Sequence, residues 1–211
     1  MTGDSALGSL SSRLTPARRE ILWVVVGQGA TILGGFAGIK ALTNVMGPEA
    51  YGRLGLGMTI AGFLGQFVYG PLGQAVFRFY SAYRERSALH VYFDVFKRIH
   101  FFVAFIVLIL CGVSVGATYS WIGVEWAWLT GAALLFGLIS GVNGSFLALN
   151  NAIRARKIVA LHDAADAWLR VACALAALHF FANRGYIALT GYLVGTLLVT
   201  VSQGIFFSVI V

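Results

Sequence analysis

The 211-residue sequence has few of the residues from which disulfides, metal sites and catalytic sites are usually built. It contains two cysteines, four histidines and eight acidic residues. Cys111 and Cys173 both fall inside long apolar stretches, so we interpret them as small apolar residues. No histidine has the spacing to another histidine, cysteine or carboxylate that metal binding requires. We therefore expect no enzyme activity, no metal and no cofactor.

Two further absences narrow the class of protein. No segment alternates apolar and polar residues as a half-buried strand does, so the apolar stretches are predicted to be helices. No basic patch interleaved with stacking aromatic residues lies on a soluble segment, which argues against nucleic-acid binding. We attribute the formal net charge of +7 to membrane topology and to anionic lipid.

What the sequence does contain is apolar residues, which make up 59% of the chain and gather in long stretches. Six such stretches run over residues 21–46, 52–80, 101–119, 127–149, 158–182 and 186–211. Each is near or above the ~20 residues that a helix needs to cross the hydrocarbon core of a bilayer. The sequence therefore predicts an all-α polytopic membrane protein with six transmembrane helices.

The Lys and Arg residues are concentrated in every second gap between the stretches. The basic residues of these gaps are Arg13, Arg18, Arg19, Arg84, Arg86, Lys97, Arg98, Arg154, Arg156 and Lys157. The intervening turns carry only Arg53 and Arg184. Because basic residues are retained on the cytoplasmic side, both termini are predicted to be cytoplasmic, as expected for a protein of the cytoplasmic (inner) membrane.

Three shorter segments add to this topology. Residues 1–20 are polar and are expected to form a cytoplasmic tail, with Pro16 opening the first helix. Residues 88–99 mix bulky apolar and charged side chains, which predicts an amphipathic helix lying in the membrane interface. The last stretch ends without basic residues, so we expect the chain to be the first part of something longer.

The turn between the first two stretches carries a recognisable motif. Its residues are Gly47, Pro48, Glu49, Tyr51 and Gly52. The second stretch is rich in glycine and closes on Gly70, Gly73, Arg78 and Phe79. Over residues 20–86 this pattern resembles the amino-terminal signature of Wzx-type oligosaccharide flippases. That family belongs to the multidrug/oligosaccharidyl-lipid/polysaccharide exporter superfamily.

The resemblance implies a fold and a function. Members of the family have two six-helix lobes around a partly cationic cavity, and this chain would supply the amino-terminal lobe. The implied function is flipping of an undecaprenyl-linked oligosaccharide across the inner membrane, for polysaccharide and lipopolysaccharide biosynthesis. The implied partners are membrane lipids, the lipid-linked glycan and a second lobe, from the same gene product or from another copy.

Polar residues inside the fifth stretch are the strongest site candidates. His162, Asp163, Asp166 and Arg170 share one side of the predicted helix, and Arg170 follows Asp166 by one turn. Arg170 is too deep to reach the interface easily, so it should face protein or a wet cavity and pair with Asp166. One hypothesis is an anionic-substrate or proton-coupling site, and the other is an ion pair that only holds helices together. The opposite arc, which includes Trp168, is expected to face lipid.

Four further polar residues are weaker candidates. Lys40 and Arg78 lie near the ends of their stretches, where a basic side chain either reaches the interface or lines the cavity. Gln66 and Gln74 lie deeper and can hydrogen-bond across helices. Two other functions stay open at this point. One is a drug or cation antiporter of the same superfamily, which Asp163 and Asp166 favour, and the other is a membrane interaction module that transports nothing.

Overall fold

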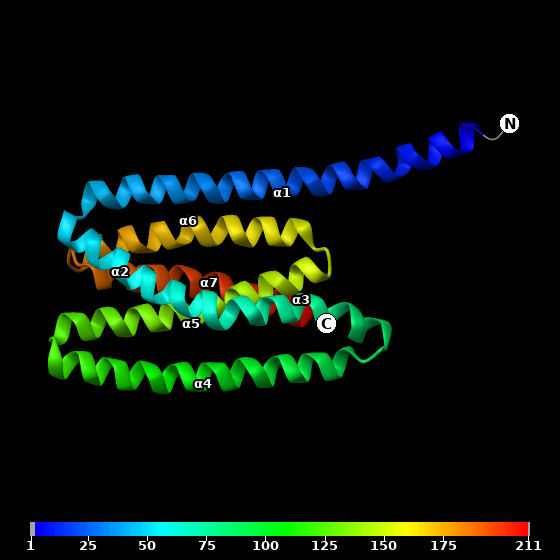
Figure 1. The fold of residues 1–211 in the computed structure, drawn as a ribbon. Coiled ribbons are helices and arrows are strands. Elements are labelled where there is room, and N and C mark those ends of the chain that lie inside the picture. Colours follow the sequence, from blue (N-terminus) through cyan, green and yellow to red (C-terminus); the bar gives the residue numbers. More distant parts are fainter. Residues whose placement is uncertain (1–2, 211) are drawn as a thin grey trace.

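The computed structural model describes the backbone of residues 3–210 and the side chains of residues 18 and 20–207. The regular structure of this part of the chain is entirely helical, which confirms the all-α class there. Its elements are α1 (Gly3–Val45), α2 (Pro48–Leu64), the π-helix η1 (Gly65–Tyr69), α3 (Gly70–Glu85), α4 (Leu89–Trp121), α5 (Val124–Ala152), α6 (Arg156–Phe180) and α7 (Gly185–Ile210). Figure 1 shows the long helices running side by side, joined by short turns.

Four helices in the described residues are long and apolar enough to cross a membrane. They are Glu20–Val45, Leu89–Trp121, Val124–Ala152 and Gly185–Phe207. Helix α6 is long enough but not among these four, because three charged residues lie near its middle. The stretch at 52–80 is divided among α2, η1 and α3, which are 17, 5 and 16 residues long. Four apolar helices of this length are compatible with a membrane protein, and the six spans stay a prediction.

Two helices are longer than the sequence predicted. Helix α1 begins at Gly3, within the segment 1–20 that we expected to be a tail, and residues 1–2 lie outside the described part. The segments 88–99 and 101–119 form one continuous helix, α4, because no glycine or proline between them interrupts it. Tyr92, in the first turn of α4, donates a hydrogen bond from its hydroxyl to the carbonyl oxygen of Val76 at 2.9 Å. The start of α4 is thereby packed against α3.

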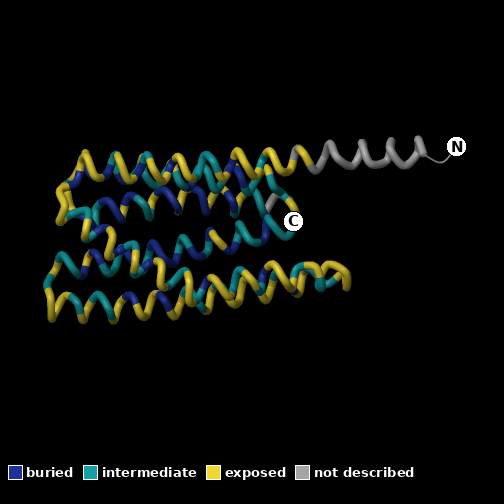
Figure 2. Tube along the Cα trace, turned by 45° about the horizontal axis from the view of Figure 1, so that its top comes forward, coloured by how far each residue is buried: buried dark blue, intermediate teal, exposed yellow. Residues whose placement is uncertain are grey.

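Helix α5 is the centre of the bundle. It packs against α2, α3, α4 and α7, while α7 packs against α6 and α6 against α1. Helices α1 and α4 lie at opposite edges of this arrangement (Figure 1). Figure 2 shows both edge helices largely exposed and the dark blue buried residues mainly on the helices between them.

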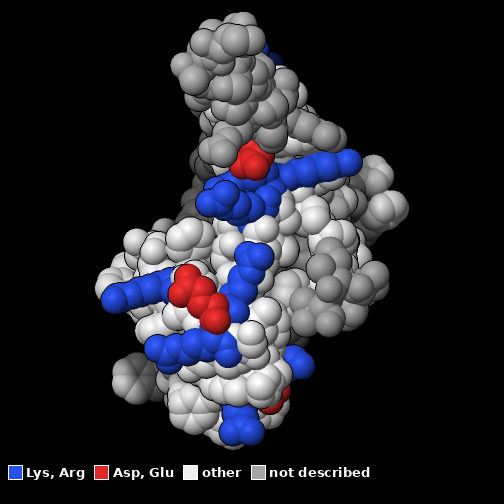
Figure 3. All heavy atoms as spheres, turned by 90° about the vertical axis from the view of Figure 1, so that its right-hand side faces the viewer, with Lys and Arg blue, Asp and Glu red and all other residues white. Residues whose placement is uncertain are grey.

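The two ends of the bundle differ in charge. The N-terminus, the end of α7, the α3–α4 turn and the α5–α6 turn lie at one end (Figure 1). Figure 3 looks onto this end and shows the Lys and Arg side chains gathered on it. We call it the basic end, and the end with the other three turns the opposite end. The structure thus places both described ends of the chain on the side of the basic end (Figure 1), and their cytoplasmic location stays a prediction.

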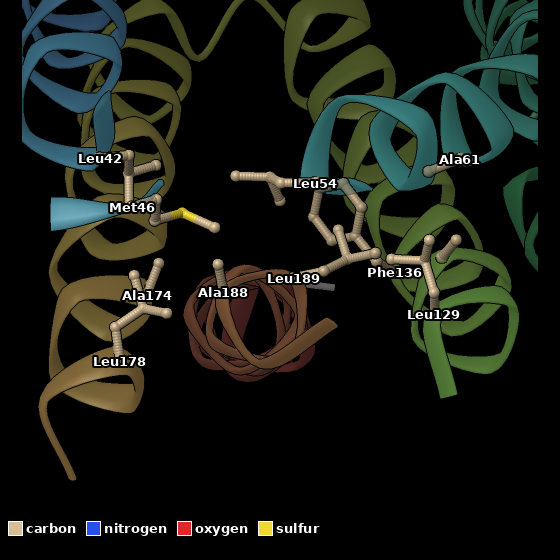
Figure 4. Close-up of a cluster of buried hydrophobic side chains, with 11 residues drawn as sticks. Leu42, Met46, Leu54, Ala61, Leu129, Phe136, Ala174, Leu178, Ala188 and Leu189 are labelled. Carbon is tan, nitrogen blue, oxygen red and sulfur yellow. The ribbon is translucent and has the colours of Figure 1, made fainter. Parts of the chain in front are cut away.

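The largest buried apolar cluster lies in the half of the bundle near the opposite end. Its members come from five helices and the α1–α2 turn and are Leu42, Met46, Leu54, Ala61, Leu129, Ala133, Phe136, Ala174, Leu178, Ala188 and Leu189. Figure 4 shows α7 in the middle of this cluster, with Leu189 beside Phe136. Apolar packing therefore closes this half, while the cavities described below extend toward the basic end.

Close helix contacts depend on glycines at a few positions. A Cβ on Gly38 of α1 would lie 2.6 Å from Cγ2 of Val171, and the Trp168 indole donates to the Ala30 carbonyl at 3.1 Å. Helix α1 therefore covers part of the arc of α6 that we expected to face lipid, while Trp168 stays 49% exposed. A Cβ on Gly191 of α7 would lie 2.5 Å from Cα of Ala174. Helices α6 and α7 can approach this closely only because no side chain stands between them.

Candidate functional site

A cavity of about 690 Å³ lies between the α2–η1–α3 segment and α5, with α6 behind it. Seven of its lining residues are glycines: Gly62, Gly65, Gly70, Gly73, Gly137, Gly141 and Gly144. Residues without side chains leave space between helices and expose backbone to whatever occupies it. The cavity therefore owes its size to the glycine content that the sequence shows at these positions.

Arg170 lines this cavity and is held by three helices. Its Nε donates to Oγ1 of Thr196 at 2.8 Å, and an Nη donates to Oγ of Ser140 at 3.3 Å. The guanidinium also forms an ion pair with Asp166, one turn earlier on α6. The guanidinium carbon also lies 5.1 Å from the ring centroid of Phe136. These contacts fix the orientation of the charge at the cavity wall.

A second arginine lines the same cavity at the basic end. Arg156 opens α6, and its guanidinium donates to the side-chain oxygen of Asn151 at 2.5 Å. Arg156 and Arg170 are separated by ~21 Å along α6 at 1.5 Å per residue. Arginine binds phosphate oxygens in a fixed, often bidentate geometry. The cavity is thus lined by one arginine at the basic end and by another farther along α6.

The π-helix η1 shapes the wall opposite α5. Tyr69 ends this element and packs its ring directly over Gly141, at a distance that leaves no room for a Cβ. A π-helix shifts the side chains that follow it relative to a regular α-helix, and such bulges are frequent at functional sites. The structure places η1 just before Gly70 and Pro71.

A smaller cavity of about 260 Å³ adjoins the first and shares Ser140, Gly144 and Arg170 with it. Its other lining residues are Thr31, Asn143, Leu147, Asp163, Asp166 and Ala167. Asp163 accepts a hydrogen bond from the Thr31 hydroxyl at 3.4 Å. Arg170 therefore stands between a glycine-lined cavity and a carboxylate-lined one.

The structure brings some of the predicted site residues together and leaves others apart. Asp163, Asp166 and Arg170 meet at the smaller cavity, and Gln74 lines the larger one. Lys40, Arg78 and Gln66 are exposed and line none of the described cavities.

The motif turn lies at the opposite end of the bundle and takes part in a charge network. Gly47 precedes α2, and Pro48 begins it. Arg53 pairs with Glu49 at 2.6 Å and also with Glu125, which accepts from Arg184 at 2.6 Å. These contacts join α2, α5 and the turn before α7. Sequence reasoning did not anticipate this network.

Several site residues were also missed from the sequence. Ser140 and Asn143 line the smaller cavity and Thr196 contacts Arg170, but all three come from predominantly apolar stretches. Arg156 was used only to assign topology. The signal that could have found Asn143 and Thr196 is their polarity within a predicted membrane span, where unpaired polar groups are unfavourable.

The fold and the cavities define an all-α protein with apolar helices suited to a membrane and an arginine-containing cavity between them. No protein-family model matches the chain, and neither a curated protein nor a solved structure matches it.

Proposed function

We propose that the chain is one six-helix lobe of a flippase that moves a lipid-linked oligosaccharide across the cytoplasmic membrane during polysaccharide biosynthesis. The six spans would be α1 from Glu20 onward, α2–η1–α3 taken together, α4, α5, α6 and α7. In this proposal both termini are cytoplasmic, and a second lobe covers the face on which the cavities open. The motif in residues 47–52 supports the assignment through its resemblance to the flippase family.

The observation that carries the proposal is the large cavity with an arginine at each end. A lipid-linked oligosaccharide carries a pyrophosphate between its lipid and its glycan, and the guanidinium groups of Arg156 and Arg170 suit such an anion. The glycines leave space beside them for a bulky substrate. Charged residues within membrane spans usually mark substrate or ion pathways.

The runner-up is a drug or cation antiporter of the same superfamily. It is favoured by the smaller cavity, where Asp163 and Asp166 present carboxylates. The two proposals differ in the sign of the substrate charge, so uptake of a cationic dye into vesicles separates them.

The topology predicts the location of each turn. Reporter fusions after residues 90 and 155 are expected to be cytoplasmic, and a fusion after residue 122 periplasmic, because the basic residues flank the first two positions. The measurement uses a paired phosphatase and fluorescent reporter at each site. A periplasmic signal at residue 90 would overturn the orientation.

Replacing Arg156 with alanine is expected to weaken anion binding by about tenfold, since a charge-assisted hydrogen bond at the basic end of the cavity is lost. Binding is measured with farnesyl pyrophosphate on the purified chain in detergent. The same variant, produced together with a second lobe in a strain without its own flippase, is expected to export less surface polysaccharide.

Lys157→Ala is the matched control. Lys157 is the next residue of α6, carries the same charge, lies over the Trp23 ring at 5.5 Å and does not line the cavity. Equal losses in the two variants would show that general surface charge, and not the cavity, attracts the anion. Absence of farnesyl pyrophosphate binding to the folded chain would count against the flippase proposal itself.

A further inference from the structure

A groove of about 450 Å³ lies between α3 and the first part of α4. Its residues on α3 recur every three or four positions, so they share one face of the helix. They include Leu72, Val76, Phe79, Tyr83 and Arg86. The larger cavity is lined by the other face of α3, through Gly70, Gly73, Gln74 and Phe77. Helix α3 therefore separates the groove from the cavity, and a molecule bound in one does not occupy the other.

Aromatic side chains form one wall of the groove and hold its two helices together. Tyr92 of α4 is buried, and its hydroxyl donates to the carbonyl oxygen of Val76 on α3 at 2.9 Å. Its ring centroid lies 5.9 Å from that of Tyr83. Phe96 and His100 continue the wall, with ring centroids 4.1 Å apart. Because these contacts fix α4 against α3, the width of the groove is set by the fold itself.

The groove opens on an edge of the bundle. Phe79 of α3 and Val95 of α4 line it and are 51% and 45% exposed. Helix α4 forms this edge and is largely exposed along its length (Figures 1 and 2). It is also one of the four helices that are long and apolar enough to cross a membrane. In a bilayer, hydrocarbon chains would therefore be the molecules nearest to the groove.

The length and the charge of the groove match one leaflet of a bilayer. Leu72 and Arg86 are ~21 Å apart along α3 at 1.5 Å per residue, and half of a bilayer with its headgroups is ~20–22 Å thick. Arg86 follows α3 in the α3–α4 turn, which lies at the basic end. It forms no ion pair with any side chain that the structure describes. Its guanidinium is thus available to a lipid phosphate, which arginine can bind through two hydrogen bonds.

We propose that this groove binds one anionic phospholipid of the leaflet at the basic end. One acyl chain lies along α3 against Tyr92 and Phe96, and the phosphate accepts hydrogen bonds from Arg86. The surrounding segment selects a lipid with net negative charge, because residues 84–98 contain four Lys or Arg and two Asp or Glu. The inference requires that α4 lies in a membrane, but it does not depend on flippase activity.

The test is native mass spectrometry of the purified full chain released from detergent. The chain is titrated with phosphatidylglycerol or with phosphatidylcholine that carries the same acyl chains. We expect the first phosphatidylglycerol to bind roughly tenfold more tightly than phosphatidylcholine, and Arg86→Ala to weaken it by roughly tenfold, since a charge-assisted hydrogen bond is lost. Ala75→Phe places a ring in the groove and is expected to abolish binding of this first lipid.

Arg84→Ala and Ala117→Phe are the matched controls. Arg84 lies two residues before Arg86, carries the same charge and is exposed, but it does not line the groove. Ala117 is an exposed residue of α4 outside the groove. Phosphatidylglycerol binding that persists in both controls and weakens in Arg86→Ala supports the site, even when Ala75→Phe does not fold.

Three results would overturn the proposal. They are equal losses in Arg84→Ala and Arg86→Ala, equal affinity for the two phospholipids, and tighter binding of undecaprenyl phosphate than of phosphatidylglycerol in the same groove. The last result would assign the groove to the lipid tail of a glycan carrier. Neither farnesyl pyrophosphate binding nor glycan export enters the measurement, so failure here is distinguishable from failure of the flippase proposal.

Discussion

Replacing Arg170 with alanine is expected to lower the free energy of unfolding by about 3–5 kcal/mol, the cost of removing one partner of a buried ion pair. Asp166 would remain almost fully buried without its guanidinium, and Thr196 and Ser140 would lose a donor. The measurement is denaturant unfolding of the purified chain in detergent, followed by circular dichroism. A variant as stable as the wild type would contradict the role of this pair in the fold.

The double variant Asp166→Leu/Arg170→Leu separates the structural role of the pair from its functional role. Joint replacement of a buried ion pair by apolar residues is often neutral, so we expect stability to return. If Arg170 binds the anion, farnesyl pyrophosphate binding stays lost in this stable protein. Recovery of both stability and binding would show that the pair only holds α6 in place.

Replacing Gly195 with alanine is also expected to lower the stability of the protein strongly. The added Cβ would lie 2.7 Å from the backbone nitrogen of Arg170 and 2.8 Å from the carbonyl oxygen of Leu169. Neither backbone atom can move without moving α6, so we expect a loss of stability of about 1–3 kcal/mol, as for overpacked cores. Unfolding in denaturant measures it, and weaker anion binding should accompany it because Arg170 shifts.

Gly204→Ala is the control for this prediction. Gly204 lies on the same helix, and a Cβ there would meet no atom within 4 Å. Alanine is favoured over glycine in a helix interior by up to about 1 kcal/mol, so this variant should be as stable as the wild type or more stable. Similar losses of stability in the two variants would mean that the close contact between α6 and α7 is not what makes alanine unfavourable at position 195.

The features of the fold that follow from composition were predictable from the sequence. Long apolar runs dictate helices, and the distribution of basic residues places both described ends of the chain at the same end of the bundle. Helix limits were less predictable. Residues 88–99 contain no helix-breaking residue, so the predicted interfacial segment simply continues into the span. The π-helix at 65–69 has no local signature that distinguishes it from an ordinary glycine-rich helix.

The candidate site was predictable only where its contacts are local. Asp166 and Arg170 are four residues apart, and that spacing on a helix is sufficient to predict their pairing. Thr196 and Ser140 are far from Arg170 in sequence, so only the packing of α5, α6 and α7 brings them to it. The hydrogen bond from Trp168 to Ala30 of α1 could not be predicted for the same reason, since nothing local to α6 shows that α1 packs beside it.

The contact between α6 and α7 has a consequence for the gene. Every single base change that turns a glycine codon into the codon of another amino acid introduces a Cβ. At positions 191 and 195 that atom would lie 2.5–2.8 Å from backbone atoms of α6. At both positions an amino-acid replacement is therefore opposed unless the helices separate, whereas position 204 accepts alanine. The close approach of α6 and α7 therefore restricts the amino-acid sequence of α7 at these two positions.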